Sequence, residues 1–460
     1  MTAAGSVFAQ ETLRAGYFLE DYKYRHTLNP AFGNNQGFVA IPVLGNFNVA
    51  MMSNVGVNTF LYKMPNGQLT TFMNNSVDAN TFLGKLNNIN KLNVDFSTPI
   101  IAVGFKGLGG YNTVTIGVRT EAGISLPKDL FTFMKLGMTS DETKYNFKNL
   151  SASADAYAEI ALGHSHQVNE RLRLGGTLKV LLGAGHASAK ISNMDVTMSG
   201  DKWEIDATGK LEMSAGEGLY VPTKAEAGKV EDKPNMANNI EWGDIEYNDF
   251  HIAGWGLALD GGAVYKVNDA LEVSASVTDF GFITWNNTYK GHTDNNPWVF
   301  DGFHNIPFNS DQPDYDDNKL DQQVDDLLDD LQDLVNFNRT QTGRNQARML
   351  TTNIHLGGEY KMPFYNKLSA SVLYTAHLKG PYSWNEGRIY ANVSPVKWFN
   401  ASINYGISEF GSSMGWILNF HPKGFNVFIG SDHQFFNITP QVVPVGHANM
   451  SVSFGFNAAF

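Results

Sequence analysis

Charged side chains recur at every second position of segments in which the intervening residues are apolar. In SASADAYAEIALG the carboxylates of Asp155 and Glu159 alternate with apolar residues, and in ERLRLGGTLKVLLGAG the cations alternate with leucines. Residues two apart share one face of a β-strand, so we expect Glu159 to lie near Lys179 on neighbouring strands. Such a face is either a network of ion pairs or the lining of a path for polar molecules, and the sequence leaves both open. The residues that share this parity are Asp155, Tyr157, Glu159, Arg171, Arg173, Lys179, Asp260, Lys266, Glu272, His355, Glu359, Lys361, His377 and Arg388.

No pattern in the chain indicates catalysis. The segment GHSHQ holds His164, Ser165 and His166, but no carboxylate is placed to orient a serine–histidine pair, and GxSxG, HExxH and phosphate-loop motifs are absent. The chain has no cysteine, which excludes disulfides and thiolate ligands, and its net charge of −12 argues against a nucleic-acid partner. We therefore predict neither an enzyme nor a bound metal or cofactor.

Alternation with period two predicts long strands throughout the chain, and none of its apolar stretches approaches the roughly 20 residues of a spanning helix. The predicted fold is an all-β transmembrane antiparallel barrel of about 14 strands, with a small N-terminal plug and helical external loops. We expect strands near 38–57, 98–107, 110–121, 150–166, 171–187, 250–266, 270–285, 350–362, 367–380, 386–395, 398–410, 413–421, 424–433 and 448–460.

The connections alternate between short and long, as in outer-membrane barrels. Short turns such as VNER and HPKG join the strands at one end, which would face the periplasm with both termini. The segment 188–212 also alternates, and it is either a hairpin above the membrane or a further pair of spanning strands, which would make 16. Long external loops are expected at 60–97, 121–149, 187–249, 286–349 and 433–447.

Aromatic residues beside the short turns fall on the apolar parity of their strands, as expected of a girdle at a membrane surface. They are Tyr265, Tyr360, Phe399, Phe420, Phe425 and Phe460. A soluble β-sandwich has no reason to place aromatic residues in this way. The strand 270–285 changes parity near Asp279, which indicates a bulge.

Two loop segments have helical spacing. In PKDLFTFMKLGM at 127–138, Pro127 suits a helix start, and apolar residues occur on nearly all sides of the predicted helix. In residues 310–338, leucines recur at helical spacing and aspartates occupy the other face, which predicts an amphipathic helix. Its acidic face is either solvated or docks a partner. The segment lacks an EF-hand pattern.

The N-terminal region carries a family resemblance. In RHTLNPAFGNN, the run Asn29, Pro30, Ala31 and Phe32 resembles the NPA motif of the FadL family of fatty-acid transporters and of the related PorV-type barrels of Bacteroidetes. The resemblance implies that residues 11–36 form a plug and 37–460 the barrel; a periplasmic tail is the alternative for 11–36. Residues 1–10 are similar to the end of a secretory signal peptide.

The resemblance also implies roles for two groups of aromatic and apolar residues. FadL-type barrels capture ligands on helical loops, which would give that role to Leu130, Phe131, Phe133 and Met134. Packing of this helix on the barrel rim is the alternative. The last strand, with Phe454, Phe456 and Phe460, resembles the signal that the barrel-assembly machinery reads during biogenesis.

Two functions remain open at this point. The first is a FadL-like channel in the bacterial outer membrane for hydrophobic or small molecules, in contact with outer-membrane lipid, with a lateral gap at 278–282. The second is a structural or cargo-shuttle subunit of an outer-membrane secretion or assembly complex, which would have protein partners.

Overall fold

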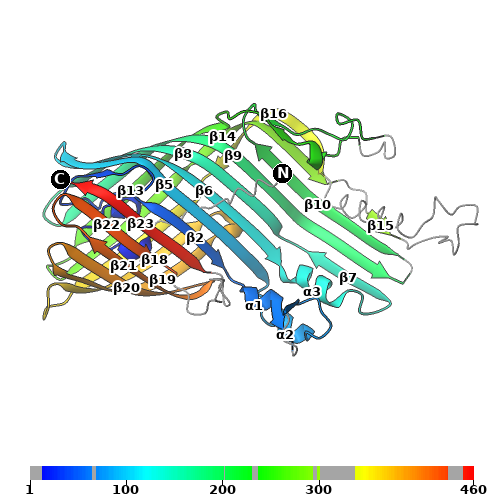
Figure 1. Cartoon of the computed structure of the whole chain (residues 1–460), viewed down its shortest axis with the longest axis horizontal. Coiled ribbons are helices and arrows are strands. Elements are labelled where there is room, and N and C mark those ends of the chain that lie inside the picture. The colour runs from blue at the N-terminus through cyan, green and yellow to red at the C-terminus, as the bar shows by residue number, and fades with distance from the viewer. Residues whose placement is uncertain are drawn as a thin grey trace, which may run out of the picture.

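The computed structural model describes residues 13–64, 69–200, 202–230, 237–293, 298–300, 337–433 and 449–460. In these ranges fourteen antiparallel strand positions form a closed barrel, because the last strand pairs with the first (Figure 1). The predicted fold class is confirmed. The wall consists, in order, of β1 (Phe38–Ala40) with β2 (Phe47–Ser53), β5 (Ile89–Gly107), β6 (Gly110–Pro127), β8 (Leu150–Gln167), β9 (Leu172–Ser199), β13 (Gly254–Lys266), β14 (Leu271–Thr293), β16 (Phe337–Met349) with β17 (Thr352–Lys361), β18 (Leu368–Leu378), β19 (Trp384–Val396), β20 (Phe399–Ser408), β21 (Gly411–Phe420), β22 (Phe425–Ser431) and β23 (Met450–Ala459).

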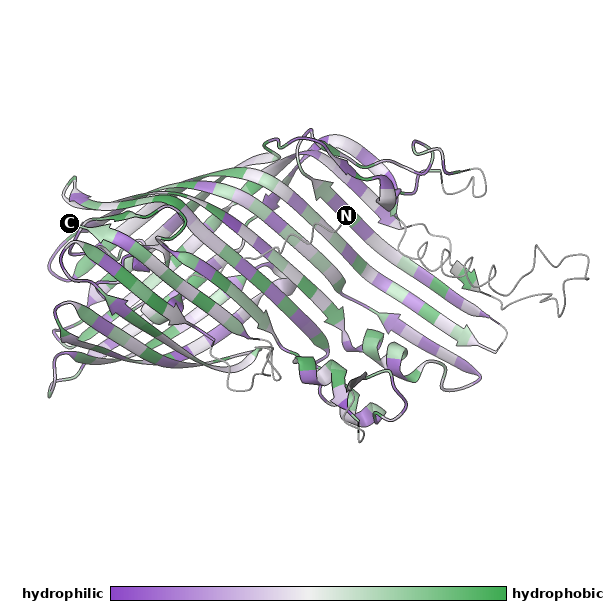
Figure 2. Ribbon diagram, in the orientation of Figure 1, coloured by the Kyte–Doolittle hydropathy of each residue, from purple (hydrophilic) through white to green (hydrophobic). Residues whose placement is uncertain are grey.

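Hydrophobic and hydrophilic residues alternate along the strands (Figure 2). The outer surface of the barrel is apolar and its lumen is polar, as the period-two pattern requires. On β13, Trp255, Leu257 and Leu259 are exposed on the outside, whereas Ala258 and Asp260, on the opposite parity, are buried inside. A bilayer would cover this apolar outer face. Among the described residues, no helix is long and apolar enough to cross a membrane.

The C-terminus lies at the short-turn end of the barrel (Figure 1). Aromatic side chains ring this end. The side chains of Tyr265, Tyr360, Phe420 and Phe425 are exposed on the outer face, and that of Phe399 is half-buried. The predicted girdle is therefore present on the outside of the wall.

One side of the wall is much taller than the other. Strand β9 is 28 residues long, whereas β20 on the opposite side has 10. Strand β10 (Trp203–Ser214) pairs with β9 and β14, while β7 (Glu142–Phe147) and β15 (Trp298–Phe300) extend the same sheet beyond the ring (Figure 1). Much of the predicted loops 121–149 and 187–249 is thus strand, and the segment 188–212 raises the wall without adding to the count of fourteen.

The first crossing, predicted as one strand over 38–57, is interrupted between β1 and β2. Pro42 has no N–H to give to a ladder, and Val43 adopts a positive φ of 66°. The Val43 amide instead donates to the Pro99 carbonyl at 3.1 Å, and the Thr98 hydroxyl donates to the Val43 carbonyl at 2.8 Å.

Small elements lie beside the wall at the loop side of the barrel. Helices α1 (Val57–Phe60), α2 (Ala79–Leu83) and α3 (Lys128–Leu136) pack together beside the hairpin β3 (Leu61–Lys63) and β4 (Leu69–Thr71). A second hairpin, β11 (Leu219–Tyr220) with β12 (Glu246–Tyr247), belongs to the segment 215–249. The predicted acidic helix at 310–338 lies almost wholly outside the described residues, as do 434–448 of the loop 433–447.

Candidate functional site: the lumen and its mouth

The N-terminal segment, residues 13–36, lies inside the short-turn half of the lumen. Its amides at Arg14 and Ala15 each donate to the Asp432 carboxylate at 2.7 Å. The Ser276 hydroxyl donates to the Leu28 carbonyl at 2.7 Å, so the segment is bound to opposite parts of the wall. Its apolar side chains form two buried clusters with wall residues; their N-terminal members are Leu13, Ala15, Tyr17, Phe18, Leu19, Tyr22, Tyr24, Leu28, Ala31 and Phe32.

The NPAF run docks on a part of the wall that consists of glycine and alanine residues. The Asn29 amide nitrogen lies 3.4 Å from the carbonyls of Ala263 and Ala275, and its Oδ1 accepts from the Ala31 amide at 3.0 Å. The Pro30 carbonyl lies against Gly175, where a β-carbon would come within 2.1 Å of it. Phe32 joins the second apolar cluster.

In the GHSHQ segment, the serine binds the N-terminal segment. The buried Ser165 hydroxyl donates to the Ala31 carbonyl at 2.9 Å. His164 lies instead beside Asn112, with its Nδ1 2.9 Å from the amide oxygen. Ser165 therefore has a docking contact to the N-terminal segment.

A buried ion-pair cluster crosses the middle of the lumen. Arg119 contacts Glu159 at 2.9 Å and Asp279 at 2.8 Å. Lys179 contacts Asp260 at 2.8 Å and Asp279 at 2.6 Å. Glu159 lies near Lys179, as expected, and the two are linked through Arg119 and Asp279.

Sequence reasoning missed Arg119 and Asp279, although signals for both exist. Arg119 continues the polar parity of its strand, and Asp279 stands where the parity of its strand changes. The bulge is present: Asp279 has a φ of 60°, which turns its carboxylate into the lumen. The expected lateral gap at 278–282 is not open in this structure, because β14 stays paired on both sides, and the Leu350 amide donates to the Gly281 carbonyl at 2.9 Å.

Several other predicted lumen residues also have polar partners inside the barrel. The Glu359 carboxylate accepts from the Ser369 hydroxyl at 2.6 Å, and the Arg173 Nε donates to the Gln167 side chain at 3.0 Å. Arg388 forms a buried pair with Glu386 at 2.7 Å, to which Arg14 of the N-terminal segment adds at 3.0 Å. The contact of Arg14 with Glu386 links the segment electrostatically to the wall.

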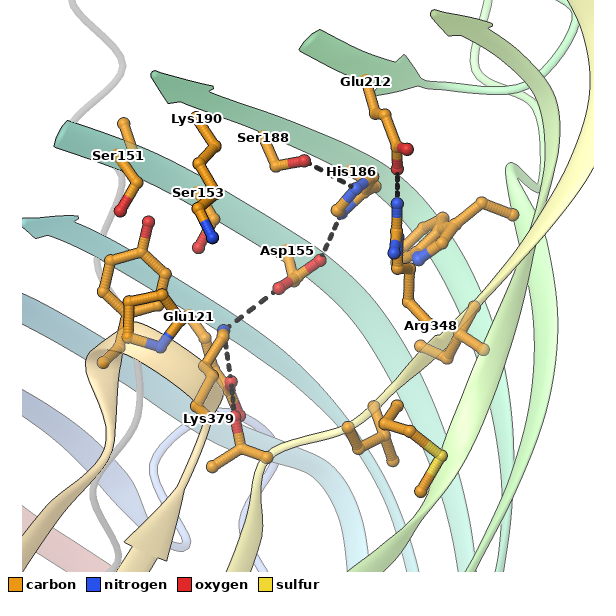
Figure 3. A pocket seen from close by; sticks show the side chains of 18 of the residues that line it. Glu121, Ser151, Ser153, Asp155, His186, Ser188, Lys190, Glu212, Arg348 and Lys379 are labelled. Carbon is orange, nitrogen blue, oxygen red and sulfur yellow. Dashed lines mark hydrogen bonds and ion pairs between the residues drawn. The ribbon is translucent and has the colours of Figure 1, made fainter. Parts of the chain in front are cut away.

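Above the central cluster, at the foot of the tall wall, the lumen opens into a cavity of about 440 Å³, which we call the mouth cavity. Lys379 contacts Glu121 at 2.7 Å and Asp155 at 3.0 Å, and Asp155 contacts His186 at 2.7 Å (Figure 3). Apolar residues form part of its lining, namely Tyr157, Ile283, Trp285 and Leu350. The cavity is therefore amphipathic, and its volume is in the range of small-molecule sites.

The chain belongs to the family of unknown function DUF5723, whose model matches residues 30–432. No curated protein matches the chain.

Among solved structures, the toluene transporter TbuX of Ralstonia pickettii is similar with a TM-score of 0.42 and 9% identity over 95% of this chain and 93% of that one. A Pseudomonas aeruginosa FadL homologue is similar with a TM-score of 0.35 and 10% identity over 99% of both chains. The toluene transporter TodX of Pseudomonas putida gives a TM-score of 0.35 and 8% identity over 99% and 94%. Likenesses this low carry no functional information.

The predicted capture helix is α3, and most of its apolar residues are used in packing. Phe131 is buried against Phe72 and Phe82 of the α1–α2 region. Leu130 and Phe133 pack on the opposite side, against the cluster of β7, β9 and β10. Met134 is 39% exposed and remains available to a ligand.

The aromatic residues of the predicted assembly signal lie on the last strand as follows. Phe454 stacks on Phe47 at 5.0 Å, and Phe456 stacks on Phe425 at 6.2 Å. The Phe460 side chain is 70% exposed at the short-turn end, while its backbone pairs with Gly37 at 2.9 and 3.1 Å.

No three His, Asp or Glu side chains in the described ranges are grouped to hold a metal ion.

Proposed function

We propose that the protein is an outer-membrane channel that admits small molecules with apolar parts through the mouth cavity. The amphipathic mouth cavity, open to the loop side and lying above a lumen occupied by residues 13–36, is the observation that carries this proposal. Apolar walls with a few placed polar groups are typical of small-molecule sites.

Passage through the lumen requires movement of the N-terminal segment. Below the mouth cavity, the cavity beside Arg14, Asp279 and Trp384 has a volume of only about 40 Å³, which leaves room for little more than water. A ligand that shifts the channel toward an open state must bind that state more tightly, and the mouth cavity is the place where it would do so.

The proposal is tested by filling the mouth cavity. Ser188 is half-buried and lines it, whereas the neighbouring Ala187 is exposed and does not. We expect Ser188→Trp to reduce uptake of a neutral fluorescent aromatic probe by cells several-fold, because the indole occupies the space. Ala187→Trp is the matched control and should leave uptake unchanged, with both variants present as folded barrels in the outer-membrane fraction.

Uptake that is equal in both variants and in cells lacking the protein would contradict a channel function.

The predicted capture role of α3 needs a separate variant. Phe131 is unsuitable because it is buried, and Met134→Asp changes the exposed face alone. Loss of uptake in Met134→Asp would extend the ligand path onto α3.

A second candidate function, a subunit of an outer-membrane complex, is favoured by the surface of the segment 215–252. Tyr220, Trp242, Tyr247 and Phe250 are exposed there, and exposed aromatic residues are enriched at protein interfaces. Pull-down of the tagged protein in mild detergent, followed by mass spectrometry, separates the candidates. A stoichiometric protein partner would favour the subunit, and a lone barrel with a co-purified apolar ligand would favour the channel.

A further inference from the structure

A row of polar side chains crosses the inner face of the tall wall at the mouth cavity. Strand register places Ser151 of β8 opposite Lys190 of β9, and Lys190 opposite Lys210 of β10. One step deeper, Ser153 stands opposite Ser188. All five residues line the mouth cavity, and Figure 3 shows Ser151, Ser153 and Lys190 along one side of it.

The two lysines are an uncompensated pair of positive charges. Both are exposed, and neither has an ion pair within the part of the chain that the structure describes. Glu212, two residues from Lys210, is held by Arg348 and lies 3.9 Å from Lys290. Like charges directly opposite one another on a sheet are unfavourable, so this pair is stabilised by any anion that contacts both.

Two hydroxyls beside the lysines also lack partners. Ser151 is 7% exposed, and its Oγ is buried without a hydrogen bond among the described residues; the Oγ of Ser153 is in the same state. A buried polar group without a partner is unfavourable. A ligand with acceptor oxygens would supply the missing partner.

We propose that the mouth cavity binds an organic phosphate: its phosphate lies between Lys190 and Lys210 and accepts from Ser151, and its apolar part lies toward Tyr157 and Trp285. A phosphate monoester carries a charge near −2 at neutral pH and has three acceptor oxygens, which matches two cations and a hydroxyl. A carboxylate would neutralise only one of the lysines. This inference rests on the proposed function and names its substrate class.

The test is calorimetric titration of the purified, detergent-solubilised protein with phenyl phosphate, benzoate and inorganic phosphate. We expect phenyl phosphate to bind about ten-fold or more tightly than either of the others, because only it offers both the dianion and the ring. The double variant Lys190→Gln/Lys210→Gln should lose about ten-fold or more in affinity, and Ser151→Ala several-fold. Lys202→Gln, which removes an exposed lysine paired with Glu204 near the β9–β10 turn, is the matched control.

Binding that is unchanged in the double variant, or equal for benzoate, would overturn the proposal. The phosphate could belong to a dissolved molecule or to a lipid headgroup. If phenyl phosphate fails but vesicles of lipopolysaccharide with lipid A phosphates retain the wild type and not the double variant, the lipid source is supported. If neither probe distinguishes the two proteins, the site does not recognise phosphate.

Failure of this inference is distinguishable from failure of the channel function. If Ser188→Trp blocks uptake of the neutral probe while the lysine variants bind phenyl phosphate like the wild type, the channel stands and the phosphate site falls. If the lysines bind phenyl phosphate and no variant affects uptake, the site stands and transport falls.

Discussion

At the scale of single residues, glycines in the wall decide where the N-terminal segment can lie. Gly175 and Gly262 are direct neighbours on β9 and β13, and a β-carbon at either would collide with Asn29, Pro30 or Ala31. The next pair, Gly176 and Gly261, has no such neighbour. Beside the NPAF run, the requirement for glycine therefore belongs to Gly175 and Gly262, and the adjacent Gly176 and Gly261 are natural controls.

We expect Gly262→Ala to displace the NPAF run, because its β-carbon would lie 2.0 Å from the Asn29 Oδ1. Overpacking of this kind costs about 1–3 kcal/mol. Gly261→Ala, where nothing lies within 4 Å, should behave like the wild type. The measurements are bilayer conductance and the rate of trypsin cleavage after Arg25, both of which should rise in Gly262→Ala. Identical behaviour of the two variants would show that the motif does not depend on this contact.

At the scale of elements, residues 215–230 and 237–249 include a patch that packs on the tall wall. Val221 and Ile240 pack on Ile191 and Leu211 of β9 and β10. A charged contact adds to this packing, since Arg339 of β16 donates to the Glu226 carboxylate at 2.7 Å. The hydrogen bond from Arg339 holds the pKa of Glu226 below its usual value.

Glu226→Gln should loosen this segment at neutral pH and increase trypsin cleavage after Lys224 and Lys229. Glu217→Gln, an exposed carboxylate of the same segment, is the control. The pKa of Glu226 is lowered in the folded state. The stability that the ionised Glu226 contributes is therefore fully present at a pH above the usual glutamate pKa, and it is lost as the pH falls through the lowered pKa. Protection of the amides of 223–229 from hydrogen exchange should therefore decrease on acidification in the wild type, and less so in Glu226→Gln.

At the scale of the whole molecule, the barrel closes where β23 meets β1 and β2. The chain end takes part through the backbone pair of Phe460 with Gly37, while the Phe460 ring itself remains exposed. An exposed ring contributes little to the stability of the folded barrel. The role of the Phe460 ring would therefore be recognition during assembly and contact with the membrane interface.

We therefore expect Phe460→Ala to lower the amount of folded barrel in the outer membrane several-fold while leaving folding into detergent unchanged. Phe364→Ala removes another exposed aromatic side chain from the same end and is the control. Heat-dependent gel migration of membrane fractions measures both. Equal amounts of the two variants in cells would remove the proposed role of Phe460 as an assembly signal.

Much of the barrel follows from the sequence alone. Period-two alternation places the strands and assigns Asp155, Lys179, Asp260 and Glu359 to the interior, because residue parity fixes the face of a strand. The turn lengths identify the ends, and the change of parity at Asp279 locates the bulge. These features depend only on residues close in sequence.

The partners inside the lumen were decided by the tertiary structure. Glu159 pairs with Arg119 and Lys179 with Asp260, because strand register and the bulge set which residues of the same face meet. The break at Pro42 and the packing of Phe131 likewise depend on segments distant in sequence. Parity is a local property of the backbone, whereas register is fixed only when the whole sheet closes. The row of Ser151, Lys190 and Lys210 therefore appears only once three strands are aligned.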